Sequence, residues 1–169
     1  MQNATHAEGS ERRTDARERP TNLAVLGERL RLEHAILRTA LEGLARALPR
    51  PTARPDPRST LMLRSAAWEL YLTLVSHLEF EETFVAPVVR DHDAWGEERV
   101  TRMICEHNEQ RRMVRELVED NESDMKSIGE LVTAARAVIA ALEVDMRSEE
   151  RLLARVLDGS SVVEDQQDG

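Results

Sequence analysis

Two stretches of the chain carry the same arrangement of imidazole and carboxylate side chains. The first has Glu33–His34 and, further on, the segment His77–Glu82; the second has Glu106–His107 and, further on, the segment Asp145–Glu150. In each later segment, a residue that can ligate a metal ion is followed by three spacers and then by two consecutive glutamates. Imidazole and carboxylate groups are common ligands of transition-metal cations. The repeat therefore predicts two halves of one metal site.

The spacing within the later segments is helical. His77 and Glu81 are four residues apart, and so are Asp145 and Glu149. Side chains at this spacing lie on the same face of a helix. Taken alone, His77 with Glu81 is more simply interpreted as an ordinary pair on a helix surface, so the prediction of a metal site rests on the whole set.

Four segments have apolar residues at helical spacing. We expect helices over residues 22–48, from Ser59 or Thr60 to the neighbourhood of Pro87, over residues 97–119 and over residues 125–157. Pro87 should kink or end the second of these helices, whose buried side is expected to continue through Phe84 and Val88. Four amphipathic helices with short links predict an all-α fold, an up-down-up-down antiparallel four-helix bundle.

The polar residues of the repeat fall inside the apolar stripes of these helices. Six of them, here called the polar cluster, are His34, His77, Glu81, His107, Asp145 and Glu149. An unpaired buried charge is costly, so groups in these positions need partners. Imidazole and carboxylate groups that converge from four helices are the ligand set of a non-haem iron or manganese site, which is often dinuclear.

Composition and charge agree with a single helical domain. The 169 residues suffice for one domain with a core, and a sequence dominated by Ala, Leu, Arg and Glu with 3% aromatic residues is typical of long helices. The net charge of −9 argues against a nucleic-acid-binding protein, which would need a basic face. Residues 1–20 and 159–169 are polar and aperiodic, and we expect disordered tails there, the second one acidic, around a folded domain at residues 21–158.

The remaining global features concern redox state and location. The single cysteine, Cys105, excludes a disulfide within this sequence and fits a reducing compartment; we expect it to be a small buried apolar group. Residues 1–20 contain no apolar stretch typical of a secretion signal, and the apolar runs fall far short of the roughly 20 residues that span a bilayer. The sequence therefore predicts a cytoplasmic protein with no membrane segment.

The repeated Glu-His helix followed by His-xxx-Glu-Glu resembles the hemerythrin-like (HHE cation-binding) family, over residues 23–157. The resemblance implies a four-helix bundle that holds two carboxylate-bridged iron ions, with manganese as a possible alternative. It also implies a small ligand, such as dioxygen, peroxide or nitric oxide, and it identifies no protein partner. By residue it implies the ligands His34, His77, Glu81, His107 and Glu149, with Glu150 as the competing carboxylate on the fourth helix.

Two positions depart from the family pattern. Asp145 stands where the family has its fourth-helix histidine, and Arg111 stands where oxygen-carrying members have a second histidine, four residues after His107. Asp145 can still ligate iron, whereas an arginine cannot ligate a cation. A site richer in oxygen ligands favours the ferric state and Mn(II), and it is more typical of oxygen-activating centres than of reversible carriers.

Three functions stay open at this point. The first is a di-iron protein that reacts with or senses oxygen, peroxide or nitric oxide, and the second is a di-iron oxidase or oxygenase that acts on a small organic substrate. The third is a bundle that has lost its metals and serves as an interaction module. No separate effector domain is evident, which weakens the sensor interpretation, while Asp145 favours the enzyme.

Residues around the polar cluster have weaker claims. Arg38 and Arg111 occupy equivalent places, four residues after His34 and His107. Each could pair with a carboxylate or bind an anionic substrate, although a side chain that snorkels at the bundle edge is the favoured interpretation. We expect Glu82 to face outward.

Overall fold

A computed structural model describes residues 23–49, 57–92, 95–122 and 127–157. Its helices are α1 (Leu23–Ala47), α2 (Pro57–Phe80), α3 (Ala86–His92), α4 (Gly96–Glu122) and α5 (Ile128–Leu157), with a π-helical turn, η1 (Glu81–Val85), between α2 and α3. The two tails that the sequence predicts lie outside the described residues. Among the described helices, none is long and apolar enough to cross a membrane.

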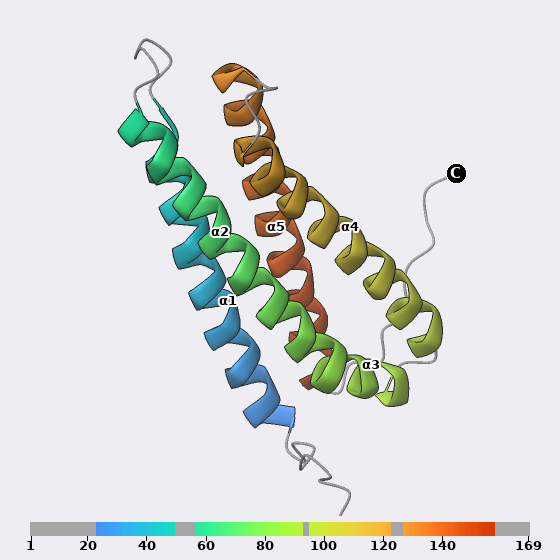
Figure 1. The fold of residues 1–169 in the computed structure, drawn as a ribbon. Helices are drawn as coiled ribbons and strands as arrows, with labels where there is room; N and C mark the ends of the chain where they lie inside the picture. Colours follow the sequence, from blue (N-terminus) through green and yellow to red (C-terminus); the bar gives the residue numbers. More distant parts are fainter. Residues whose placement is uncertain (1–22, 50–56, 93–94, 123–126, 158–169) are drawn as a thin grey trace, which may run out of the picture.

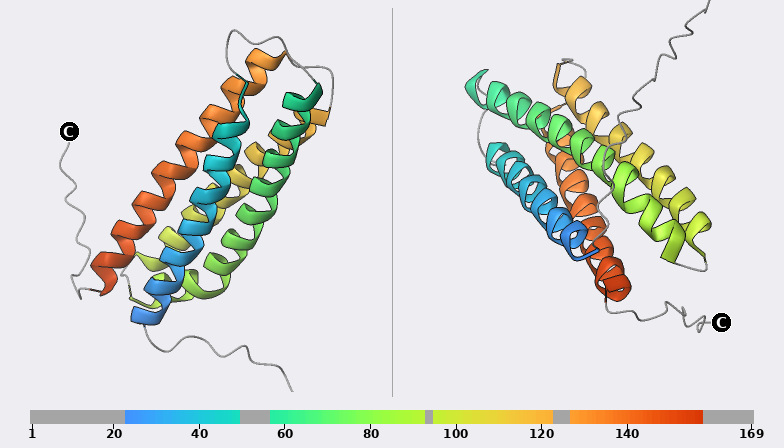
Figure 2. Two further views of the ribbon diagram at one scale, coloured as in Figure 1. Left: turned by 90° about the vertical axis from the view of Figure 1, so that its left-hand side faces the viewer. Right: turned by 90° about the horizontal axis from the view of Figure 1, so that it is seen from below.

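The described residues form four helical rods, because α2, η1 and α3 follow one another without a break. α1 packs against α2 and α5, and α4 also packs against α2 and α5. Successive rods run in opposite directions, as Figure 1 and the two further views in Figure 2 show. The predicted all-α, up-down-up-down four-helix bundle is confirmed.

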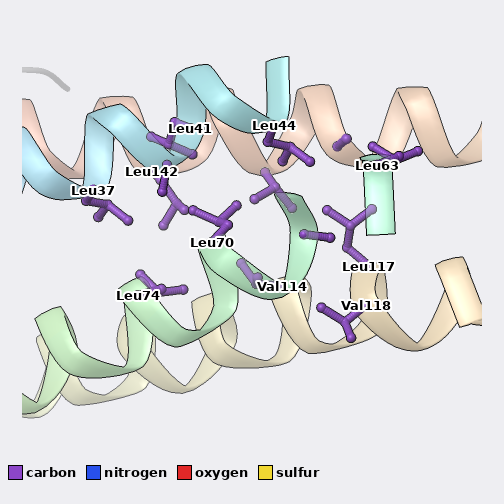
Figure 3. Packing of buried hydrophobic residues seen from close by; sticks show 14 of the residues in the cluster. Leu37, Leu41, Leu44, Leu63, Leu70, Leu74, Val114, Leu117, Val118 and Leu142 are labelled. Atoms are coloured by element: carbon purple, nitrogen blue, oxygen red, sulfur yellow. The ribbon is translucent and has the colours of Figure 1, made fainter. Parts of the chain in front are cut away.

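Buried apolar side chains form two clusters along the bundle. The larger one, the long cluster, consists of Leu37, Ala40, Leu41, Leu44, Leu63, Ala67, Leu70, Leu74, Leu78, Val114, Leu117, Val118, Leu131, Ala135, Val138, Leu142 and Met146. Figure 3 shows part of this cluster. The smaller one, the short cluster, consists of Leu26, Leu30, Val85, Ala86, Val89, Val100 and Leu153. Each rod contributes side chains to both clusters, so each rod must pass from one cluster to the other at a point between them.

The second rod changes its helical period where Pro87 disturbs it. Proline has no N–H to donate and clashes with the preceding turn, and the N–H of Ala86 bonds to the carbonyl of Glu81, five residues earlier. Pro87 therefore neither ends the rod nor leaves it regular. The wider turn also shifts the buried face: Val85 and Val89 are buried, whereas Phe84 and Val88, which the regular pattern placed inside, are only half-buried.

Three further expectations need correction. The second helix begins at Pro57 rather than at Ser59 or Thr60, because proline suits the first turn of a helix. The last helix begins at Ile128 rather than near residue 125. There the Ser127 N–H donates to Glu130 Oε2 (2.8 Å) and the Glu130 N–H donates to Ser127 Oγ (3.4 Å), which is a capping box. Cys105 is exposed and not buried.

Glycine is required at the start of α4, where the chain turns back from α3. A Cβ atom on Gly96 would lie 2.5 Å from the backbone oxygen of Arg90 and 2.6 Å from that of Val89. Across this turn, Arg90 Nε donates to Glu97 Oε2 (2.7 Å). The close turn holds α3 beside the start of α4, next to the short cluster.

Candidate metal site

The polar cluster occupies the passage between the two apolar clusters. On α1, His34 comes between Leu30 of the short cluster and Leu37 of the long cluster, and on α5 Glu149 comes between Met146 and Leu153 in the same way. The side chains of His34, His77, Glu81 and His107 are at most 3% exposed. Asp145 and Glu149 are half-buried. Two apolar clusters thus enclose a layer of titratable groups.

Glu81 lies at the centre of this layer. Its Oε1 atom is 3.4 Å from His77 Nε2 and 3.7 Å from His34 Nε2, and its Oε2 atom is 3.1 Å from His107 Nε2. Neither oxygen makes a hydrogen bond to any described residue. Each of these oxygens, and an unprotonated Nε2, has a lone pair to offer. Glu81 is thus a buried carboxylate whose two oxygens lie close to imidazole nitrogens but accept no hydrogen bond from them. Such an arrangement is suited to hold cations between the carboxylate and the imidazoles.

Four members of the cluster could hold one ion. Glu149 Oε2 is 3.1 Å from His34 Nε2, and one ligand atom from each of His34, His77, Glu81 and Glu149 lies within 4.8 Å of the others. This group draws on α1, on the second rod and on α5. The structure therefore brings together four of the six residues that the sequence singled out in a group of metal-binding dimensions.

The other two members lie beside this group. His107 reaches the second oxygen of Glu81, as described above. Asp145 accepts a short hydrogen bond from the Nε2 atom of Gln110, a buried side chain on α4. The sequence pattern had not singled out Gln110, because a glutamine at helical spacing from a histidine carries no ligand signal of its own.

An outer carboxylate and an arginine hold the imidazole of His34. Its Nδ1 atom donates to Glu150 Oε1 (2.8 Å), and Arg38 Nη2 donates to the same oxygen (2.9 Å). A carboxylate accepts but does not donate when ionised, so Nδ1 carries the proton. In neutral imidazole this leaves the Nε2 lone pair directed at the centre of the cluster.

The second half of the repeat has the same construction. His107 Nδ1 donates to Glu82 Oε1 (3.0 Å), and Arg111 Nη2 lies 2.8 Å from that oxygen. We expected Glu82 to face outward, but its carboxylate contacts both His107 and Arg111. Arg111 is therefore paired with a carboxylate. The sequence carried a signal for both, because the second glutamate and the arginine each recur at equivalent places in the two halves.

Glu149 and Glu150 therefore have different surroundings. Glu149 belongs to the group of four around His34 Nε2, and Glu150 binds the other ring nitrogen of the same histidine. In this arrangement the first glutamate of each Glu-Glu pair points into the cluster and the second supports an imidazole from outside. Arg38 and Arg111 are joined to the supporting carboxylates rather than to the inner ones.

Burial and charge divide the three histidines. Burial lowers the pKa of His34, but the nearby carboxylates of Glu149, Glu81 and Glu150 outweigh burial and raise this pKa to about 10. The pKa of His107 is raised for the same reason, against the effect of burial. Burial lowers the pKa of His77 to about 4, and the positive charges of the other two histidines act in the same direction. These shifts in pKa favour the protonated imidazole at His34 and His107 and the neutral imidazole at His77.

The carboxylates are shifted in opposite directions. Burial alone would raise the pKa of Glu81, but the three neighbouring histidines hold it below its usual range. Burial raises the pKa of Glu149, and the charges of Glu81 and Asp145 raise it further. Burial likewise raises the pKa of Asp145. A cation at this position must displace protons from imidazole and carboxylate groups, so its binding should strengthen as the pH rises.

The supporting carboxylates offer a direct mutational test. Glu82→Ala and Glu150→Ala should each weaken the binding of Mn(II) or Zn(II) by roughly 10–100-fold, the usual effect of losing a carboxylate that orients a metal-binding histidine. Affinities would be measured by competition with a chelator. The matched control is Glu79→Ala, because Glu79 is exposed on the same rod as Glu82. Parent-like affinity in both variants would show that these contacts do not orient the imidazoles.

The fold and the site together define a class of protein: an antiparallel four-helix bundle whose facing helices carry an imidazole and carboxylate cluster that could hold a metal ion. The family model of the hemerythrin HHE cation binding domain matches residues 25–157, and the chain belongs to this family. The family predicted from the repeat is thereby confirmed. No curated protein and no solved structure matches the chain.

Proposed function

We propose that the polar cluster holds two carboxylate-bridged iron ions, and that the protein uses them to react with or sense dioxygen, peroxide or nitric oxide. The observation that carries the proposal is the position of Glu81. Its Oε1 atom faces His34 and His77, and its Oε2 atom faces His107. A carboxylate with a separate set of nitrogen donors at each oxygen is suited to bridge two cations.

The donor set divides between the two ions. His34 and His77, with one oxygen each of Glu81 and Glu149, would hold the first ion. His107 and Asp145, with the other oxygens of the two glutamates, would hold the second. Nitrogen and oxygen donors of this kind suit iron and also manganese. The bound metal would supply redox chemistry and an open coordination position.

Contacts of the described residues support this site. The supporting glutamates accept hydrogen bonds from Nδ1 of His34 and His107, so Nε2 of each ring becomes available to a metal once the proton on Nε2 is displaced. The long cluster, with Leu78 and Met146 almost fully buried, excludes water from one side of the site. A layer with fixed donors and a dry wall favours tight binding and protects a reactive centre from solvent.

Two positions support reaction with oxygen rather than its reversible carriage. Arg111 is tied to Glu82 and cannot serve as a ligand. Asp145 would add an anionic oxygen ligand, which stabilises the higher oxidation state of iron.

An oxidase acting on a small organic substrate is the second candidate, favoured by a cavity beside Asp145. We also propose a cytoplasmic location, which is what the sequence leads us to expect.

Asp145→His tests this part of the proposal. A neutral nitrogen ligand in place of an anionic oxygen should stabilise Fe(II) relative to Fe(III). We expect a higher reduction potential and slower oxidation of the diferrous protein by oxygen, measured by spectroelectrochemistry and stopped-flow absorption. Glu143→Gln on the exposed side of α5 is the control for a change of charge alone.

The parent protein should be oxidised by oxygen without forming a long-lived reversible adduct. If it takes up and releases oxygen reversibly, and if Asp145→His leaves the potential unchanged, then Asp145 is not a ligand and oxygen activation is the wrong function.

A further inference from the structure

A cavity of about 230 Å³ reaches the polar cluster from the surface between α4 and α5. Its inner end is lined by Glu81, Asp145 and Glu149, and none of the three histidines of the cluster is among the described residues that line it. The carboxylate edge of the cluster is therefore the edge that faces the cavity.

The two sides of the polar cluster differ in this respect. On one side the long cluster begins at once, with Leu37, Leu78 and Met146 at most 1% exposed. On the other side lies the cavity, which is lined by Leu30, Val89 and other side chains of the short cluster, together with some of their neighbours. A molecule that enters through the cavity would meet Asp145 and Glu149 first.

The size and walls of the cavity indicate an organic molecule. Apolar side chains from all four rods form its walls, among them Leu30, Val85, Met103 and Leu152. A dry apolar cavity of about 150 Å³ can hold benzene, and a water molecule takes only about 30 Å³ in the liquid. Dioxygen or peroxide alone would occupy only a small part of this space. The volume fits a molecule of about one aromatic ring with a few additional atoms.

Charged groups are distributed unevenly along the cavity. Arg99 and Arg102 on α4 line it together with Glu106, so both guanidinium groups lie toward its mouth, whereas the carboxylates of Glu81, Asp145 and Glu149 lie at its inner end. Arg99 is the less exposed of the two arginines, and Arg102 also lies 3.6 Å from Glu98. A guanidinium can bind a carboxylate with two parallel hydrogen bonds. An amphipathic anion would thus have its charge near the mouth and its apolar body further in.

We propose that this cavity is a substrate site for a small organic acid, which lies with its apolar body against the walls and its carboxylate at Arg99 and Arg102. The inference deepens the proposed function, on which it rests for the chemistry at the inner end. Binding itself depends only on the cavity. The bound acid would present its apolar end to the edge formed by Asp145 and Glu149.

The probe for this site is 4-fluorobenzoate, followed by fluorine NMR during titration into the full chain, first without metal and then after loading with zinc. We expect saturable binding that Leu152→Trp weakens at least about tenfold, because the indole fills the cavity. The matched control is Ile139→Trp, since Ile139 is half-buried on the same helix but lines a different groove, next to Arg38. This control should bind the probe as the parent does.

A second comparison tests the charge at the mouth. The parent should bind 4-fluorobenzoate about tenfold or more tightly than 4-fluorobenzyl alcohol, as expected for a charge-assisted hydrogen bond. Arg99→Gln should reduce this preference. Equal affinity for acid and alcohol in the parent would overturn the assignment to an organic acid.

The substrate site is overturned if neither form of the protein binds the probe saturably, or if Leu152→Trp binds it as well as the parent. Metal content, measured on the same samples, separates this result from the proposed function. Protein that binds metal but not the probe loses the substrate site and keeps the metal centre. If the protein binds the probe but no metal, the cavity is still a binding site, but the proposed function is wrong.

Discussion

Glu81→Ala should abolish metal binding, leaving less than about a tenth of an equivalent per chain after reconstitution with ferrous iron. Glu81 is 1% exposed, and its two oxygens face the Nε2 atoms of three histidines. Alanine removes both of these oxygens at once. Far-ultraviolet circular dichroism should still show a helical protein, because the apolar clusters and not the site hold the rods together.

The control for this variant is Glu79→Ala, which removes an exposed carboxylate two residues earlier on the same rod. It should bind as much iron as the parent. Full iron content in Glu81→Ala would mean that the metal site lies elsewhere in the chain, and a general loss of iron in both variants would point to a nonspecific effect of charge.

Leu70→Ala should reduce the stability of the protein and leave its iron content unchanged, the opposite of what we expect for Glu81→Ala. Leu70 is fully buried in the long cluster, seven residues before His77, and its truncation leaves a cavity that the packed neighbours cannot fill. We expect the free energy of unfolding of the metal-free protein to fall by about 2–5 kcal/mol, measured by chemical denaturation. Iron content should stay at the parent level, because no side chain of the polar cluster is changed.

Leu72→Ala is the matched control on the same helix, since this leucine is 64% exposed. Its unfolding free energy should stay within about 0.5 kcal/mol of the parent. If Leu70→Ala were no more destabilising than Leu72→Ala, the long cluster would not be the main source of stability. If it lost iron as Glu81→Ala does, then site and core would not be separable.

Much of the fold and of the polar cluster could be predicted from the sequence because helical periodicity assigns faces without knowledge of the tertiary structure. Leu30, His34 and Leu37 share one face of α1 at any crossing angle, so a histidine within a leucine stripe had to lie in the core. The same reasoning applied to His77 and Glu81. A repeat whose two copies together place such residues on all four helices then predicted that these side chains converge.

Local backbone changes and contacts between helices could not be predicted in this way. Pro87 indicated a disturbance, but whether it ends, bends or widens the helix depends on which carbonyl the N–H of Ala86 finds, and that N–H bonds to Glu81. The partner of Glu82 is on another helix, 25 residues away. Cys105, two residues before His107, is exposed, because residues two apart on a helix lie on different faces and His107 lies on the buried face of α4.

The same limit applies to the cavity. Arg99, Arg102 and Leu152 carry no pattern that connects them in the sequence, and they meet only because α4 and α5 lie side by side at this end of the bundle. A binding cavity depends on the space that two helices leave between them, and helical periodicity does not determine that space.

Whether Glu81 bridges two metal ions can be decided from the iron content of the full chain. The protein would be reconstituted with ferrous iron without oxygen, freed of unbound metal and measured by elemental analysis together with protein concentration. We expect about two iron ions per chain. One ion per chain would contradict the bridged pair, and less than about a tenth of an equivalent would contradict a metal site altogether.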